Sequence, residues 1–181
     1  MKSILNRYTI SLDIDVLTNI GEYKLNFYLK CELENIPDSE FIYMRRVGEY
    51  GPENKILMER FKSWLKNNVT SDENTTILSI ALDNPELVSP NECRYDVGMI
   101  FKDDFIENDI EEKIYSRKIG GGKYLVYLIP HNQESIQSIW INYHKVLIQK
   151  GYSQDYKRPI VERYKKSLVD NHLCELCVPI I

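Results

Sequence analysis

The chain has 181 residues, a mass of 21.4 kDa and a net charge of −4, with 23 Lys and Arg against 27 Asp and Glu. Its 43% apolar and 28% charged residues are typical of one globular domain and exclude a disordered chain. The acidic balance argues against direct binding to nucleic acid. The sequence has no run of about 18 apolar residues that could cross a membrane, and no secretory signal is evident. We therefore expect a cytoplasmic protein.

The first half of the chain is predicted to contain one helix among several strands. Residues 8–17 and 24–34 alternate polar and apolar side chains, which predicts two strands that pair as a hairpin. The next elements are listed in chain order: a strand at 41–47, a helix from Pro52 to Asn68, and strands at 77–82 and 95–101. Proline is tolerated in the first helical turn, so Gly51-Pro52 marks where this helix begins.

The second half is predicted to repeat this order. The acidic segment 102–112 is expected to be a solvated loop or a short helix. After it we expect a strand at 123–129, an amphipathic helix at 132–150, and strands at 160–164 and 174–180. Strand, helix, strand, strand therefore occurs twice, about 80 residues apart, without identity between the halves. The pattern predicts an α+β fold of two pseudo-symmetric βαββ repeats, with two long helices on one side of a largely antiparallel sheet and a ligand cleft between the repeats.

Acids within strands and a large number of tyrosines are the residues most able to bind a ligand. Glu162, Glu175 and Asp96 each lie among apolar or aromatic neighbours, where a carboxylate that faces a cavity needs a cationic partner or a proton to transfer. The chain has 13 tyrosines, and a tyrosine hydroxyl needs a partner when buried. Aromatic walls beside an acid suit flat aromatic or cationic ligands. The aromatic candidates are Tyr43, Tyr95, Tyr124, Tyr127, Trp140, Tyr143 and Tyr164.

Other motifs carry little chemistry. Cys174 and Cys177 are spaced as Cys-x-x-Cys, but they fall in a predicted strand, where residues three apart face opposite sides. The glycines at 120–122 precede a strand and not a helix, which argues against a phosphate loop. No serine or cysteine nucleophile has a recognisable signature. We therefore expect no metal and no cofactor.

Several motifs resemble gyrase-inhibitor-like (GyrI-like) domains. The resemblance runs from about residue 24 to 181, and its most specific block joins Asp83-Asn84-Pro85-Glu86 to Arg94-Tyr95-Asp96. It implies a domain at 24–181 with repeats at 24–101 and 119–181, preceded by a strand extension at 1–23. It also implies binding of small aromatic or cationic molecules, as in effector-binding domains of AraC-type and MerR-type regulators. Glu162, in Pro159-Ile160-Val161-Glu162-Arg163-Tyr164, matches the acid that contacts cationic ligands in drug-sensing relatives.

Three functions follow from these observations. The first is a small-molecule-binding protein, with Glu162 and Glu175 as charged contacts. Its predicted aromatic wall comprises Tyr43, Tyr95, Tyr124, Trp140, Tyr143 and Tyr164. The second is a hydrolase of reactive electrophiles, such as cyclopropane-bearing toxins, in which Glu162 or, less well matched, Glu175 activates water. The third is a protein-interaction module with a protein partner such as gyrase or a transcription regulator, or with a second copy of itself.

Overall fold

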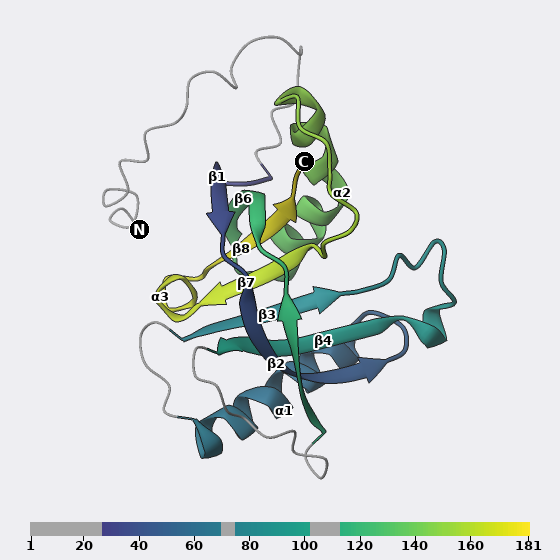
Figure 1. The fold of residues 1–181 in the computed structure, drawn as a ribbon, viewed down its shortest axis with the longest axis vertical. Coiled ribbons are helices and arrows are strands. Elements are labelled where there is room, and N and C mark those ends of the chain that lie inside the picture. The colour runs from purple at the N-terminus through teal and green to yellow at the C-terminus, as the bar shows by residue number, and fades with distance from the viewer. Residues whose placement is uncertain (1–26, 70–74, 102–112) are drawn as a thin grey trace, which may run out of the picture.

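The computed structural model describes residues 27–69, 75–101 and 113–181 (Figure 1). The predicted strand at 8–17, the start of that at 24–34 and the acidic segment 102–112 lie outside these residues. The strands are β1 (Lys30–Ile36), β2 (Ser39–Val47), β3 (Thr76–Ala81), β4 (Arg94–Phe101), β5 (Ile114–Ile119), β6 (Gly122–Pro130), β7 (Val161–Lys165) and β8 (Leu173–Pro179). The helices are α1 (Pro52–Asn68), α2 (Gln133–Gln149) and the short α3 (Lys166–Val169), with a 3-10 turn at Pro90–Glu92. No helix within the described ranges is long and apolar enough to cross a membrane.

In the part of the chain that the structure describes, eight strands form one antiparallel sheet in the order β1-β6-β8-β7-β3-β4-β2-β5. The two repeats meet at its centre, where β3 pairs with β7 and Ser79 lies opposite Glu162. Helix α1 packs on β2 and β4, and α2 packs on β6 and β8, so both long helices cover the same face (Figure 1). The predicted fold class and repeat order are confirmed.

Both long helices begin and end close to the predicted residues, for local reasons. Helix α1 has Pro52 in its first turn and Glu53 beside the positive end of the helix dipole. Helix α2 is capped by Asn132, whose side chain accepts a hydrogen bond from the Ser135 backbone N–H at 2.9 Å.

The edge strands are exchanged between the repeats. Strand β1 belongs to the predicted first repeat (24–101) but pairs with β6 of the second, whereas β5 precedes most of the second repeat (119–181) but pairs with β2 of the first. Strand β5 was not predicted, since it is short and half of its side chains are exposed. Leu29 and Leu33, apolar residues of the predicted strand at 24–34, are 39% and 52% exposed, because Leu29 and the edge strand β1 that follows it have a neighbouring strand on one side only. The formation of β5 and the edge position of β1 both depend on pairing with strands far away in the sequence, which local patterns do not reveal.

Three apolar clusters hold the sheet and helices together. One lies under α2 and includes Leu125, Ile139 and Leu176; another lies under α1 and includes Ile42, Phe61 and Val97. The third lies on the face of the sheet that the helices leave uncovered, and its members come from both repeats: Phe41, Tyr43, Leu78, Ile80, Tyr124, Val126, Val161 and Cys177. On the helix face, the central strands β3 and β7 lie between the first two clusters, and this is where the cleft forms.

Candidate ligand-binding cleft

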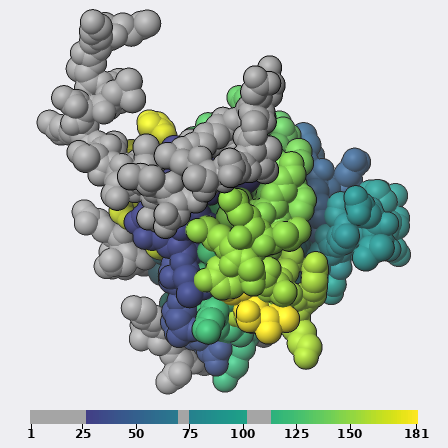
Figure 2. Space-filling model, turned by 90° about the horizontal axis from the view of Figure 1, so that it is seen from above, coloured from purple at the N-terminus to yellow at the C-terminus, as the bar shows by residue number. Residues whose placement is uncertain are grey.

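A wide cleft runs over β3 and β7 between the two long helices. Its volume is about 2270 Å³, and its lining includes residues of α1, α2, β3, β4 and β7 together with the connections that follow β3 and α2. The β3–β4 loop, within the teal segment of Figure 2, projects from the body of the molecule beyond α2, which is light green. The cleft therefore lies at the junction of the repeats, as the sequence predicted.

Glu162 lies at the centre of the cleft floor and accepts hydrogen bonds from four elements. Its Oε1 accepts from the indole Nε1 of Trp140 on α2 at 2.6 Å. Its Oε2 accepts from the Ser79 hydroxyl on β3 at 2.6 Å and from the Tyr164 hydroxyl at 2.8 Å, and lies 3.5 Å from the Tyr95 hydroxyl on β4. The carboxylate is thus held in one orientation by strands and a helix from both repeats.

Burial and the charge of Glu162 keep the two tyrosine hydroxyls protonated. Desolvation, and then the nearby Glu162 carboxylate, raise the pKa of Tyr95 and of Tyr164 well above 10. Both side chains are therefore hydrogen-bond donors at neutral pH. The ring of His131 lies 5.2 Å from that of Tyr164, and burial, followed by the charge of Lys62, lowers the pKa of His131 below 6.5.

Five of the eight predicted ligand-binding residues come together in the cleft. They are Tyr95, Trp140, Tyr143, Glu162 and Tyr164. The Trp140 and Tyr143 rings stand at 88° to each other with centroids 6.3 Å apart, and the Tyr143 hydroxyl donates to Gln154 at 3.1 Å. Ser79 was missed by sequence reasoning, although it is a polar residue between apolar neighbours in its strand and is only 1% exposed.

The structure places the other three, Tyr43, Tyr124 and Glu175, on the opposite face of the sheet, and none of them lines the cleft. Tyr43 stacks on Phe41 with ring planes 7° apart, and Tyr124 lies under the guanidinium of Arg158 at 4.8 Å. Alternation along a strand buried on both faces shows which residues share a face, but not which face is covered by helices.

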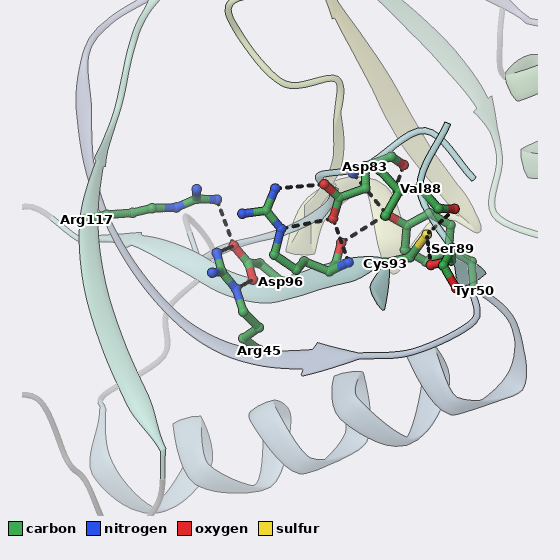
Figure 3. A network of polar contacts seen from close by, with 9 residues as sticks. Arg45, Tyr50, Asp83, Val88, Ser89, Cys93, Asp96 and Arg117 are labelled. Carbon is green, nitrogen blue, oxygen red and sulfur yellow. Dashed lines mark hydrogen bonds and ion pairs between the residues drawn. The ribbon is translucent and has the colours of Figure 1, made fainter. Parts of the chain in front are cut away.

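Asp96 and Glu175, which the repeat placed in equivalent positions, are both paired with cations on this opposite face. Asp96 is fully buried and accepts from Arg45 at 2.6 Å and from Arg117 on β5 at 2.8 Å (Figure 3). Glu175 accepts from Arg163 at 2.7 Å and lies 3.2 Å from Lys165. Arginine and lysine side chains thus neutralise both Asp96 and Glu175 within the fold.

A polar network closes the base of the loop between β3 and β4 (Figure 3). The Asp83 carboxylate accepts from the Arg94 guanidinium at 2.7 and 2.9 Å and from its backbone N–H at 2.7 Å, and these bonds lower the pKa of Asp83. The Tyr50 hydroxyl lies 3.0 Å from the carbonyl oxygens of both residues. The motifs at 83–86 and 94–96, which carry the family resemblance, therefore hold the base of a loop whose residues 83–87 line the cleft.

Cys174 and Cys177, spaced as Cys-x-x-Cys, occupy apolar surroundings. Cys174 lies in the cluster under α2 and Cys177 in the cluster on the other face, so their side chains diverge as the strand period predicts. Burial raises the pKa of each thiol to about 12. Among the residues that the structure describes, no three His, Cys, Asp or Glu side chains form a group that could hold a metal ion.

Comparison with known proteins agrees with this architecture. A family model described as a GyrI-like small molecule binding domain matches residues 29–181. YosT of Bacillus subtilis (strain 168), an SPbeta prophage-derived protein named as a candidate transcriptional regulator, is 40% identical over 153 residues, which are 84% of this chain and 99% of YosT.

Solved structures share the fold at low identity. The EcmrR C-terminal domain has a TM-score of 0.63 at 15% identity, over 84% of this chain and 97% of that domain. EcmrR in a complex with DNA has a TM-score of 0.64 at 16% identity, and the match covers 86% of this chain but only 58% of that one. SAV2435 bound to tetraphenylphosphonium has a TM-score of 0.53 at 12% identity, over 84% of this chain and 94% of that chain.

The two-repeat fold, its central cleft and the family match together define a small-molecule-binding domain. The chain belongs to the GyrI-like family, which confirms the resemblance inferred from its motifs.

Proposed function

We propose that the chain binds small aromatic cations in the cleft, with Glu162 as the charged anchor and aromatic side chains as the walls. The observation that carries the proposal is the unneutralised charge of Glu162. Each of the buried or half-buried acids Asp83, Asp96 and Glu175 is paired with an arginine. Glu162 makes no ion pair with any lysine or arginine in the described ranges, and its four donors are neutral. Neutral donors orient a carboxylate but cannot cancel its charge, so a cation from outside the chain completes the site.

The aromatic residues around Glu162 favour a ligand with a delocalised or shielded cation. Tyr95, Trp140, Tyr143 and Tyr164 present π faces and edges within one cleft, and a cation beside such rings is attracted by about 0.5–2 kcal/mol per contact. The tetraphenylphosphonium bound by SAV2435, which shares the fold, supports this class of ligand. The identity to YosT further supports a role for the ligand as a signal in transcriptional control, through a protein partner or a second copy of the chain.

The geometry favours binding over hydrolysis. Short hydrogen bonds from Trp140, Ser79 and Tyr164 hold the Glu162 carboxylate in one fixed orientation, which suits a charged anchor better than a general base that must reach a water molecule. Glu175, the alternative base, is held by Arg163 and Lys165 on the other face of the sheet.

The proposal is tested by titrating the protein with tetraphenylphosphonium and following heat or Trp fluorescence. We expect Glu162→Gln to weaken binding about 30-fold or more, because removing one charge of a desolvated pair costs about 2 kcal/mol or more. The amide keeps the shape of the side chain and still accepts from Trp140. Glu86→Gln is the matched control, since Glu86 is an exposed acid that also lines the cleft, and it should change affinity less than twofold. Equal affinities of wild type and Glu162→Gln would refute the anchor role.

A further inference from the structure

The cleft has two chemically different ends, one on each side of Glu162. Along the floor, Tyr95 is opposite Ala81 and Tyr164 is opposite Ile77, so the two tyrosines lie on either side of the Ser79–Glu162 pair. Beyond Tyr95 lies Tyr50, with ring centroids 6.0 Å apart. Beyond Tyr164 lies His131. Tyr50 and His131 therefore mark opposite ends.

The course of α2 assigns its residues to these ends. The helix starts just after His131 and runs for 17 residues, or about 25 Å, with Trp140 in its middle above Glu162. Tyr143 and the connection that follows α2 therefore lie toward the end marked by Tyr50, and Tyr143 is close enough to Tyr156 for electrostatic coupling. We call this the tyrosine end. It comprises Tyr50, Leu87, Tyr95, Ile141, Tyr143 and Tyr156.

The other end is lined by charged and polar side chains. We call it the lysine end, and it comprises Lys62, Lys66, Lys166 and His131, together with Glu59 and Asp170, which pair with Lys62 and Lys166. Lys62 is close enough to His131 to lower its pKa, and the Lys166 backbone N–H donates to Thr75 at the end of the floor beyond Tyr164. An apolar tail that displaced water from these charged side chains would be less favourable here than at the tyrosine end.

The tyrosine end exposes an unusual amount of apolar side chain. Leu87 is 83% exposed, Tyr156 is 86% exposed and Ile141 is 67% exposed, yet all three line the cleft. Leu87 is not on a free loop, because the hydrogen bonds of Asp83, Arg94 and Tyr50 close the loop base (Figure 3). Three large apolar side chains that border one hollow indicate a binding surface, whereas single exposed ones do not.

We propose that the tyrosine end is a second subsite, which binds the flexible apolar tail of an amphiphilic cation whose charged head lies at Glu162. This inference rests on the proposed function and adds the shape and direction of the ligand. The cleft, at about 2270 Å³, exceeds the roughly 300–1,000 Å³ that drug-sized ligands fill, so a compact head leaves space beyond it. The subsite is continuous with the Glu162 site through Tyr95, whose hydroxyl faces the carboxylate and whose ring faces Tyr50.

The test compares two ligands that differ only in tail length, hexyltrimethylammonium and dodecyltrimethylammonium, both below the concentrations at which they form micelles. Full burial of one methylene strengthens binding about fourfold. Because the subsite is open to solvent, we expect about twofold per methylene, or about 60-fold tighter binding of the dodecyl ligand across the six added methylenes.

Surface variants identify the subsite. The double variant Leu87→Ser/Ile141→Ser should weaken dodecyl binding about tenfold and hexyl binding less than twofold, because only the longer tail reaches these side chains. Val47→Ser/Ile56→Ser is the matched control, since both residues are similarly exposed and neither lines the cleft; it should change neither affinity. All four residues are exposed, and circular dichroism verifies that each variant is folded.

The outcomes separate this inference from the function on which it rests. Glu162→Gln should weaken both ligands by the same factor; if it weakens neither, or if wild type binds neither, the anchor is refuted and the subsite with it. If both ligands bind through Glu162 but with equal affinity, the anchor stands and the subsite is refuted. Equal losses for both ligands in the Leu87→Ser/Ile141→Ser variant would also overturn the subsite.

Discussion

Arg163 provides the sharpest test of how the exchanged edge strand is attached. Its side chain is only 7% exposed and donates to Glu34 on β1 at 2.6 and 2.9 Å and to Glu175 on β8 at 2.7 Å. Arg163→Met preserves most of the aliphatic volume but removes the charge, which leaves Glu175 with Lys165 alone. Breaking a buried ion pair by removing one partner costs about 3–5 kcal/mol, so we expect the free energy of unfolding to fall by that amount.

Equilibrium unfolding in urea, followed by Trp fluorescence, measures this loss. For a domain of this size, about 2–4 °C per kcal/mol predicts a melting temperature lower by about 6–20 °C. Lys118→Met is the control, because the Lys118–Glu40 pair is an exposed contact at 3.6 Å on the other exchanged strand; surface pairs contribute about 0–1 kcal/mol. A loss below about 1 kcal/mol in Arg163→Met would refute the reasoning.

The same pair predicts a pH dependence. The hydrogen bond from Arg163 lowers the pKa of Glu34 below 4.5 in the folded state. A lowered carboxyl pKa contributes stability that is present above the unfolded pKa and is lost as the pH falls through the folded pKa. The difference in stability between wild type and Arg163→Met should therefore shrink on acidification below pH 4.5. A difference that stays constant down to acid would contradict the role of this pair.

Two further predictions concern packing and protonation. Gly98→Ala should destabilise the fold by several kcal/mol, since its Cβ would lie 2.0 Å from the Ile42 carbonyl oxygen. Gly120→Ala is the control and should be neutral, because a Cβ at that position would meet no atom within 4 Å. Thermal unfolding compares the two variants, and an unchanged melting temperature for Gly98→Ala would contradict the close approach. His131, whose pKa burial lowers below 6.5, should gain a proton as the pH falls and then repel a cation at Glu162, so tetraphenylphosphonium should bind severalfold more weakly near pH 5 than near pH 7. His131→Gln should reduce this pH dependence, and a titration that is as steep in the variant would exclude His131 as its source.

The sequence by itself determined the elements that depend on local signals. Gly51-Pro52 and Asn132 set the starts of α1 and α2, and the alternation of apolar residues located most of the strands. The repeated order of elements was enough to predict the α+β class and the junction between the repeats. The family motif singled out Glu162, and a chain with many tyrosines made an aromatic wall a reasonable expectation.

Only the tertiary structure decided which of these side chains meet. Tyr43, Tyr124 and Glu175 share their strands with cleft-facing or helix-facing neighbours, and a strand buried on both sides carries no sign of which face the helices cover. Strand β5 and the partner of β1 were likewise set by pairings with segments far away in the chain.

Ser79 shows the same limit within the cleft itself. It reaches Glu162 because β3 and β7, which are 83 residues apart at this pair, lie side by side. Period and capping are local properties that the sequence carries directly. The face that a strand presents, the strand beside it and the ion pairs of its acids all depend on long-range contacts. These contacts place several of the tyrosines around Glu162 on the floor of one cleft.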